Sequence, residues 1–432
     1  MLFTRRWRQA ALVIPAAVVV LATSASAARP PLGQLLLSGI RADPAAPGGI
    51  CPIPAAGPPR CPADAGEPAA DPAGSGPRWL ASGTIPGTTA GQRAMAADAL
   101  LGIRLLTQND GAVAAAWYPA WTYAWPRDSS WAAAALTATG HGGTALTILR
   151  FIARMQLPSG IWAARYQLDG AGPVRDGRPD ELDANGWFPW SAWFWYQAQP
   201  RTAAAQGGLA TLWPAVARAA DATMARLGRD GLPPVSMDYW EDRVSAVTIG
   251  IAAPLYAGLR AAADLARARG DSGDARRWTA AAHRLGAAIQ ARFGATGYQR
   301  TPAAGSGADA AVTFLGPPFT PATPAVRRAV SGAARTLTLA NGGIEPGQAW
   351  PGTPGEAWTP ETAFFALYDA ASGDQAGAAR WLSWLAAHRT ADGALPEQVN
   401  AAGQPASVAP LAWTDAITLL AMTAERHPLP MP

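Results

Sequence analysis

The sequence predicts an all-α protein in which the helices pair into hairpins and the hairpins close into a ring. From Gly91 onward, apolar residues recur at helical spacing, and the alternation typical of β-strands is nearly absent. Short and long connections alternate between the expected helices, which places short turns on one face and long loops on the other. A repeat solenoid is the alternative, but the sequence has no fixed period or shared signature. The long loops of such a ring would meet and form a cleft.

Twelve helices are expected, and several end at conventional stop signals such as Gly140 and Gly270-Asp271. The long connections, rich in Trp, Pro, Gly and acids, are 108–127, 157–182, 228–244, 336–359 and 390–410. The expected helices cover residues 92–107, 128–139, 144–156, 183–199, 209–227, 245–269, 272–293, 307–315, 322–335, 360–371, 375–389 and 411–426.

The composition fits a large apolar core and gives no sign of a nucleic-acid partner. The chain has 432 residues, of which 49% are hydrophobic and only 15% are charged. The formal net charge is +4. Three of the arginines lie in the first 27 residues, and no run of five basic residues occurs elsewhere. Nucleic-acid binding is therefore not expected.

The first 27 residues have the three parts of a secretory signal peptide. Arg5, Arg6 and Arg8 form a positive segment, residues 10–22 are apolar, and residues 25–27 form an A-x-A cleavage site. The apolar segment is shorter than the ~20 residues that span a bilayer. We expect a secreted protein, extracellular or in the cell envelope, with no membrane span after cleavage.

Residues 28–78 are rich in Pro, Gly and Ala, and we expect an arm that precedes a catalytic domain at 79–432. Cys51 and Cys61 are the two cysteines, and an exported chain predicts a disulfide between them. The four histidines are scattered without metal-ligand spacing. Neither a metal site nor a cofactor is expected.

Three long loops carry the candidate catalytic and binding residues. Glu397 follows Pro396, which fixes the backbone of the loop 390–410. Glu241 follows Tyr239 and Trp240, whose rings exclude water and favour a protonated carboxyl that can act as an acid. The alternative for Glu397 is a surface glutamate, and for Glu241 it is an acid that complements the dipole of the following helix.

Arg127 and Asp128 open the expected helix 128–139 and together offer a donor fork and an acceptor, as sugar hydroxyls require. The alternative is an Asp that caps the helix beside a surface Arg. The chain has 19 tryptophans, and many lie in the long loops. A Trp ring beside carboxylates suits the apolar face of a sugar, although several of these rings are expected to serve loop packing.

Taken together, these segments resemble the glucoamylase-type family, family 15 of the glycoside hydrolases, in family order over roughly residues 91–426. The segment WPRDSS at 125–130 resembles the family's W-x-R-D segment, and ELDANGW at 181–187 resembles its Q-L-D-x-x-G segment with Glu181 in place of Gln. DYWEDR at 238–243 resembles the segment that carries the catalytic acid. Residues 356–374 and 395–416 are similar to bacterial members.

The resemblance implies an (α/α)6 barrel, a monomer, and an inverting exo-glycosidase that hydrolyses α-glucosidic bonds from the non-reducing end of an oligo- or polysaccharide. Glu241 would be the general acid and Glu397 the general base, which inversion places ~6.5–9.5 Å apart. We expect Glu241 to be the drier carboxyl and Glu397, on a polar loop, to hold a water. The substrate-binding residues that the resemblance implies are Trp125, Arg127, Asp128, Asp183, Trp240, Asp242, Trp358 and Trp413.

Two departures from the family pattern stand out. Bacterial members carry a β-sandwich before the barrel, and residues 28–78 are too short and too poor in strands for one. The family also places an Arg-Tyr segment before its G-x-x-W, whereas residues 343–347 read GIEPG without an arginine. The second departure leaves the specificity for α-glucose open.

Three other functions compete with hydrolysis. A catalytically weak or inactive barrel that binds sugar is compatible with the missing arginine, but both glutamates are present. A glycoside phosphorylase would need a phosphate cradle in place of Glu397. An all-α isoprenoid cyclase or synthase would need a D-D-x-x-D or D-x-D-D motif, which the sequence lacks.

Overall fold

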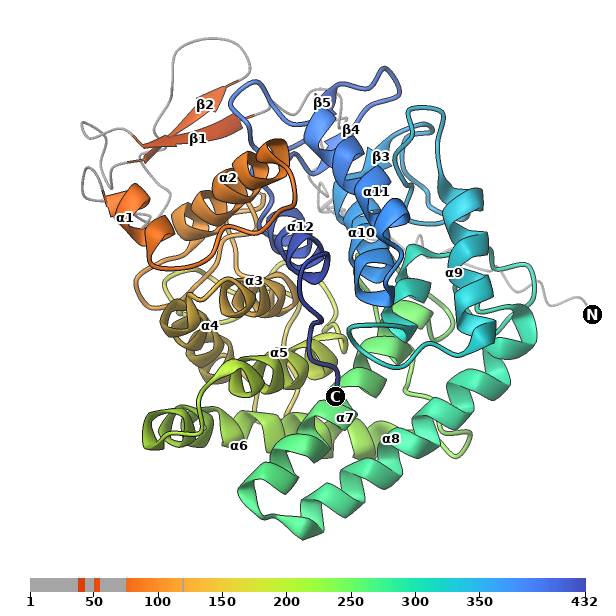
Figure 1. Ribbon diagram of the computed structural model, residues 1–432. Helices are drawn as coiled ribbons and strands as arrows, with labels where there is room; N and C mark the ends of the chain where they lie inside the picture. Colours follow the sequence, from red (N-terminus) through yellow and green to blue (C-terminus); the bar gives the residue numbers. More distant parts are fainter. Residues whose placement is uncertain (1–37, 43–49, 55–74, 119) are drawn as a thin grey trace, which may run out of the picture.

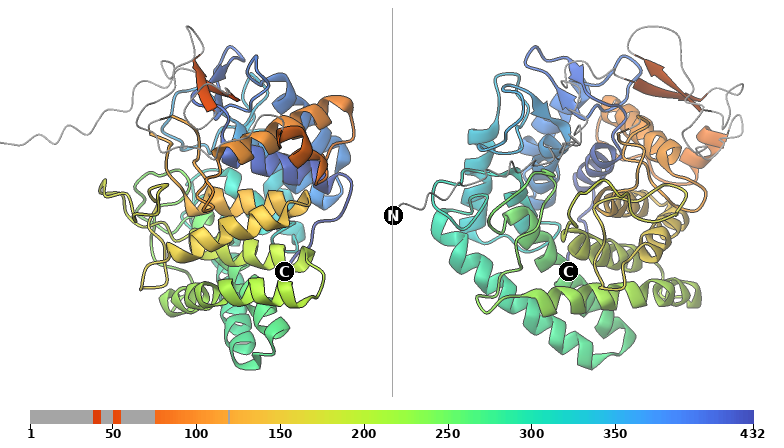
Figure 2. Two further views of the ribbon diagram at one scale, coloured as in Figure 1. Left: turned by 90° about the vertical axis from the view of Figure 1, so that its left-hand side faces the viewer. Right: turned by 180° about the vertical axis from the view of Figure 1, so that it is seen from behind.

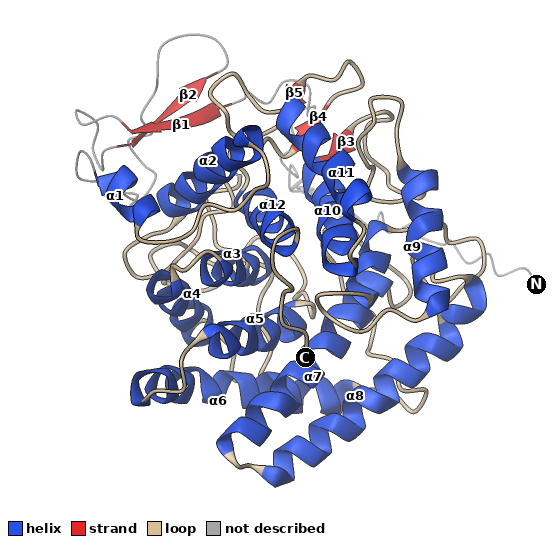
Figure 3. Cartoon of the chain, viewed as in Figure 1, coloured by secondary structure: helices blue, strands red, loops and turns tan. Residues whose placement is uncertain are grey.

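The computed structural model describes residues 38–42, 50–54, 75–118 and 120–432, and within them helices dominate (Figure 3). Six helices form an inner ring and six form an outer ring (Figure 1). The inner ring, in order, is α3 (Pro126–Ala138), α5 (Ala184–Ala198), α7 (Ile249–Arg269), η4 (Ala310–Leu315), α10 (Thr359–Ser372) and α12 (Ala412–Ala424). The outer ring is α2 (Ala90–Leu106), α4 (Gly142–Arg154), α6 (Ala203–Arg226), α8 (Ser272–Arg292), α9 (Pro324–Leu337) and α11 (Gln375–Ala387).

This architecture confirms the predicted ring of hairpins, with differences in detail. The segment predicted as a helix over 307–315 is the short 3-10 helix η4. Helix α7 begins at Ile249, four residues later than expected. The structure also describes a helix α1 (Ser75–Ala81) and an antiparallel strand pair β1 (Ser38–Ala42) and β2 (Ile50–Pro54), which the sequence did not predict. A further 3-10 turn, η3 (Gly294–Thr296), follows α8.

Helix α1 lies outside the rings and packs on them through one ring stack. Trp79 of α1 stacks on His141, with ring centroids 3.8 Å apart and planes 12° apart. The Arg104 guanidinium also lies over the tryptophan ring, 4.9 Å from its centroid. The predicted boundary at residue 79 therefore falls inside a helix that contacts the barrel. The predicted signal peptide and Cys61 lie outside the described residues, as does the Cys51 side chain.

Close backbone contact joins two neighbouring inner helices. A Cβ on Gly186 of α5 would lie 2.2 Å from the Pro254 carbonyl carbon of α7, and a Cβ on Gly258 would lie 2.5 Å from the Gly186 Cα. Only glycine allows this approach, because any side chain would push the two helices apart. The pair therefore keeps the inner ring narrow.

Aromatic side chains from most of the inner helices fill the centre of the ring. Trp131 of α3 contacts Trp187 of α5 and Phe364 of α10, with centroid distances of 4.9 and 6.2 Å. Trp413 of α12 and Tyr239 lie 5.9 Å apart at the edge of this cluster. Because the rings occupy the barrel interior, any site formed by the long loops has a closed aromatic floor.

The long loops meet on one side of the rings (Figure 2). Backbone bridges join Ala124 to Tyr166 and Glu181 to Met237, and Asp309 to Gly347. A three-stranded sheet connects β3 (Ala357–Trp358), β4 (Gln398–Val399) and β5 (Pro405–Ala406). Each long loop leads into the N-terminus of an inner helix, so the first turns of the inner helices surround a common space.

Helix α12 also has a buried carboxyl, that of Asp415, which faces the outer helix α2 and not the space between the long loops. Asp415 is 1% exposed, and neither carboxyl oxygen has a hydrogen-bond partner within the described residues. A Cβ on Gly102 of α2 would lie 2.4 Å from Asp415 Oδ2, so the glycine makes room for the carboxyl. Burial raises the Asp415 pKa well above 3.8, and the Asp98 charge adds to the shift.

We expect the Asp415→Asn variant to gain stability over the native chain as the pH rises. The folded pKa is raised, so folding favours the protonated form. The free energy of unfolding therefore falls from the unfolded pKa up to the folded pKa, by about 1.4 kcal/mol for each unit between them. Denaturant unfolding at several pH values measures the difference in the free energy of unfolding between the variant and the native chain. The pH-dependent part of this difference should vanish near pH 4, where the carboxyl is protonated in both the folded and the unfolded chain. Parallel pH profiles for the two proteins would contradict the assignment.

Candidate active site

Glu397 lies in the loop between α11 and β4, immediately before the strand, and this loop is hydrogen-bonded to the start of the inner helix α10. Its backbone N–H donates to the Val408 carbonyl at 2.8 Å, and its carbonyl accepts from the Thr359 N–H at 3.0 Å. The Trp121 indole N–H donates to Glu397 Oε1 at 3.0 Å, and the Ser407 hydroxyl donates to Oε2. Two donors fix the orientation of one carboxylate, as a group that positions a water requires. The surface alternative is wrong, because Glu397 is 8% exposed.

Glu241 lies on a sharp turn in the loop before α7. Its φ is 54°, in the left-handed region that non-glycine residues rarely adopt, and its N–H donates to the Asp238 carbonyl at 2.7 Å. Such a conformation costs of the order of 1–3 kcal/mol and persists only where the surroundings impose it. The helix-dipole alternative is wrong, because α7 begins eight residues later, at Ile249.

A buried ion cluster imposes the turn. Arg300 donates to Asp238 at 3.0 Å and to Asp309 at 2.5 Å, and both carboxyls are fully buried. The Tyr239 hydroxyl donates to Asp309 Oδ1 at 2.6 Å. The Arg300 guanidinium also lies 3.3 Å from the Trp240 ring centroid. The three residues that precede Glu241 are thus anchored beneath the site.

Arg127 is the centre of the acid cluster at the loops' common space. Its Nη1 donates to Glu181 at 2.7 Å and to Asp183 at 2.9 Å, while Nη2 lies 3.5 Å from Glu241 Oε1. Its Nε lies 3.7 Å from the Asp128 carboxyl. The guanidinium also lies over the Trp413 ring, 5.0 Å from the centroid. The buried Arg127 guanidinium therefore contacts the candidate acid Glu241, three further carboxyls and the Trp413 ring of the aromatic floor.

Burial raises the pKa of several of these carboxyls. The Asp128 pKa rises to about 6, because desolvation outweighs the attraction of Arg127. The Glu181 pKa rises to about 8 for the same reason, and so does that of Glu361 in the first turn of α10. The negative charge of Glu397 adds to the shifts of Asp128 and Glu361. Carboxyls with separated pKa values can serve as acid and base in one site.

Glu241 and Glu397 both border the Arg127–Asp128 pair. Glu241 does so through Arg127, and Glu397 is near enough for its charge to act on Asp128. The two glutamates come from loops far apart in the sequence, so the barrel brings them to one place. An acid and a second carboxylate around a donor–acceptor pair can protonate a leaving oxygen and activate a water.

Three tryptophans pack in a row that begins at Trp240, the residue before Glu241. Trp240 meets Trp350 and Trp350 meets Trp358, each edge to face at 5.1 Å between centroids. Within the described residues, the indole nitrogens of all three lack a hydrogen-bond partner. The three rings offer apolar contact, whereas their N–H groups are buried.

Most of the predicted site residues come together here, and one does not. Trp125 is buried beside the site, where the Arg165 guanidinium lies 5.1 Å from its ring centroid. Asp242 is exposed, and its carboxyl accepts from the Arg243 N–H instead of turning toward Arg127. The alternative of a capping role for Asp128 is wrong, because the N-cap of α3 is Trp125 and Asp128 is buried in the first turn of the helix. The gathered residues are Trp125, Arg127, Asp128, Asp183, Trp240, Glu241, Trp358, Glu397 and Trp413.

The expectation that Glu241 is the drier carboxyl is wrong. Glu397 is buried, whereas Glu241 is half-buried with 14% of its side chain exposed. The reason is that Tyr239 and Trp240 turn downward into the aromatic and ion clusters, which leaves Glu241 facing two arginines. Its nearest partners are therefore charged groups rather than rings.

Sequence reasoning missed five groups that the fold brings to the site. Glu181 was noted only as a departure from the resemblance, although its place two residues before Asp183 was a usable signal. Arg178, Arg300 and Glu361 have no local signal, because Glu241, Asp238 and Glu397 are distant from them in the sequence. Ser407 lies ten residues from Glu397 in the same loop, but no motif marks the contact.

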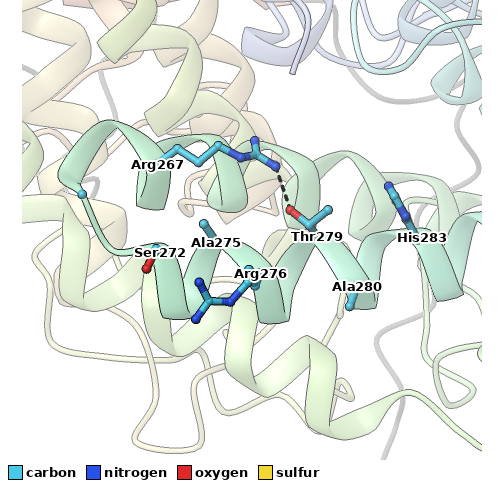
Figure 4. Close-up of a pocket in the computed structure, with 8 residues that line it drawn as sticks. Arg267, Ser272, Ala275, Arg276, Thr279, Ala280 and His283 are labelled. Carbon is cyan, nitrogen blue, oxygen red and sulfur yellow. Dashed lines mark hydrogen bonds between the residues drawn. The ribbon is translucent and has the colours of Figure 1, made fainter.

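No other part of the described chain offers a comparable cluster. The described residues include no group of three or more His, Cys, Asp or Glu placed to hold a metal. No described helix is long and apolar enough to cross a membrane. A shallow pocket lies along α7 and α8 (Figure 4), but it is at the short-turn side, and its Arg267 is already held by Asp264 and Thr279.

We expect Asp128→Ala to leave the fold intact and to lower kcat/KM by about 10²-fold, because a misplaced sugar reacts more slowly. In the native enzyme, kcat/KM should also fall as the pH drops through about 6, where the Asp128 carboxylate gains a proton. Kinetics and a melting curve for Asp128→Ala measure the loss of activity and the stability of the fold. The dependence of kcat/KM on pH in the native protein measures the titration. A lower melting temperature with unchanged kinetics would make Asp128 purely structural.

Solved structures similar to this one are glycosidases and glucoamylases. A glycosidase variant in complex with glucose aligns with a TM-score of 0.63 and 22% identity, over 77% of this chain and 96% of that one. A bacterial glucoamylase complexed with acarbose aligns at 0.62 and 16% identity, over 81% and 57%. The Saccharomycopsis fibuligera glucoamylase aligns at 0.61 and 13% identity, over 81% and 93%. No family model and no curated protein sequence matches the chain. The chain thus has the (α/α)6-barrel fold of the glucoamylases.

Proposed function

We propose that this protein is a secreted glycoside hydrolase that removes glucose from the non-reducing end of α-glucosides with inversion at the anomeric carbon. The observation that carries the proposal is the placement of Glu241 and Glu397 around the Arg127–Asp128 pair. A barrel fold alone supports many functions, so the proposal rests on these side chains.

The sugar would be bound on the aromatic floor. Trp413 offers its face, and Asp128 and Arg127 offer an acceptor and donors for hydroxyls. Glu241 would donate a proton to the glycosidic oxygen as the bond to the anomeric carbon breaks. Glu397, held by Trp121 and Ser407, would take a proton from the attacking water. No cofactor takes part in this scheme.

The test is glucose release with detection of the anomer. Maltose, maltotriose, isomaltose, dextran and trehalose cover the α-1,4, α-1,6 and α,α-1,1 linkages. Proton NMR during the first minutes should show β-glucose appearing before mutarotation. Initial α-glucose from maltotriose or dextran, where the glucose released is the attacked unit, would mean a retaining mechanism. Trehalose cleaved with inversion should give α- and β-glucose in equal amounts, because its leaving glucose keeps the α configuration. No release from any substrate would leave only sugar binding.

Export is part of the proposal. The segment 1–27 would be removed, and a disulfide between Cys51 and Cys61 would form outside the cytoplasm. N-terminal sequencing and mass spectrometry under non-reducing conditions test both points. An N-terminus at Met1 with two free thiols would contradict export.

A further inference from the structure

The loop 157–182 reaches the candidate acid with a charged side chain. Arg178 donates from Nη1 to Glu241 Oε2, the carboxyl oxygen opposite the one near Arg127. The same guanidinium contacts Asp176 through Nε at 3.2 Å, and Asp176 also pairs with Arg165. The Arg165 guanidinium lies 4.5 Å from the Tyr123 ring centroid. A chain of contacts thus joins the wall of the site to Glu241.

This contact cannot persist while Glu241 acts as an acid. A general acid must carry a proton and direct it at the leaving oxygen, within hydrogen-bond reach. In the structure both oxygens of Glu241 instead face arginines. Arg127 keeps Glu181 and Asp183 as partners if Glu241 turns away, whereas Arg178 gives up its contact inside the site.

The two sides of the contact differ in how firmly they are held. The Glu241 backbone is fixed in its left-handed turn by Asp238, which Arg300 anchors below. Arg178 comes from an irregular loop, and its side chain is 26% exposed. When the contact between Arg178 and Glu241 breaks, the Arg178 guanidinium is therefore the group that moves out of the site, while the Glu241 backbone stays in place.

From this geometry, and on the basis of the proposed function, we propose that Arg178 selects the leaving group. It exchanges the Glu241 carboxylate for the hydroxyls of a sugar leaving group, and so frees the acid only when such a group is present. A guanidinium offers several N–H donors and no acceptor, so a hydroxyl-rich leaving group suits it. The substrate class is then a glucoside whose leaving group is itself a sugar.

The experiment compares two substrates in three proteins. Kinetics are measured for the disaccharide that the native enzyme cleaves best and for α-glucosyl fluoride, which has no leaving sugar. The variants are Arg178→Gln and, as a matched control, Arg175→Gln, an exposed arginine in the same loop. We expect Arg178→Gln to lower kcat/KM for the disaccharide about 10- to 100-fold, the worth of a charge-assisted hydrogen bond. Fluoride hydrolysis should change less than about threefold, and Arg175→Gln should change neither.

The pH profile gives a second readout that a purely structural role would not move. Removing a cation beside Glu241 favours its protonated form, so the alkaline limb of kcat/KM for the disaccharide should shift to higher pH in Arg178→Gln. Arg178→Lys, which keeps the charge, should hold the limb in place.

The outcomes separate the two proposals. Equal losses on both substrates, or no loss on the disaccharide, would overturn the role of Arg178 and leave the hydrolase proposal standing. A native enzyme that cleaves neither substrate would overturn the hydrolase proposal and this inference with it.

Discussion

Replacing Glu241 with Gln should nearly abolish the hydrolysis of ordinary α-glucosides while sparing α-glucosyl fluoride. Positioned proton transfer is typically worth ~10²–10⁴-fold, and fluoride leaves with little need of a proton. Glutamine keeps the shape of the side chain and an acceptor oxygen for one of the two arginines, and Arg127 keeps Glu181 and Asp183 as partners, so the fold should not suffer. The measurement is kcat for each substrate in the native enzyme and in the variant.

Glu397→Gln is the matched counterpart. It removes the group that activates the water, so both the ordinary glucoside and the fluoride should react more slowly, by a similar factor. The amide oxygen can still accept from the Trp121 N–H, and the amide NH2 can donate to the Ser407 hydroxyl, which also accepts. Added azide, a nucleophile that needs no activation, should restore part of the rate and give a glycosyl azide of inverted configuration.

The pair of variants against the pair of substrates assigns the roles. If Glu241→Gln loses fluoride hydrolysis as severely as Glu397→Gln does, the assignment of acid and base is wrong. If both variants keep full activity, neither glutamate is catalytic and the proposed function fails.

Replacing Arg300 with Met should destabilise the protein by about 3–5 kcal/mol, the usual cost of leaving buried charges without their partner. Asp238 and Asp309 are both fully buried and both pair with this arginine. The backbone N–H of Glu241 donates to the Asp238 carbonyl, so a displaced Asp238 should also displace Glu241 and lower the activity. Denaturant unfolding measures the first effect, and kcat at a temperature where the variant is folded measures the second.

Asp242→Asn is the control for this prediction. Asp242 is exposed and next to the same turn, so its replacement should change the free energy of unfolding by no more than about 0.5 kcal/mol. Unchanged stability in Arg300→Met would mean that the fold does not depend on the contacts between this arginine and the two aspartates.

Much of the fold was predictable because helical periodicity is a local property. The alternation of short and long connections also carried the ring arrangement, since hairpins place their turns on one face. The 3-10 helix η4 shows the limit of this reasoning. It is a short apolar segment between Asp309 and Gly316 whose geometry depends on contacts with α7, α9 and α10.

The site was predictable only where its groups lie in short contiguous motifs. Arg127, Asp128, Glu241 and Glu397 each stand in such a motif, and all four come together. Arg300 carries no mark of its role, because Asp238 is 62 residues away along the chain. The environment of Glu241 was mispredicted for a related reason. Neighbours in sequence, Tyr239 and Trp240, point away from it, and arginines from other segments take their place.

The direction of the inner helices has an electrostatic consequence. Asp128 and Glu361 lie in the first turns of α3 and α10, and Asp183 and Asp309 lie at the N-cap positions of α5 and η4. An α-helix N-terminus bears the equivalent of about half a positive charge, so α3, α5, α7, α10 and α12 present positive ends to this ring of acids. That field comes from the backbone, so no side-chain replacement removes it, and salt screens it weakly in a buried site. A pocket rich in carboxyls thus needs few buried cations, and its potential is set by the topology of the barrel.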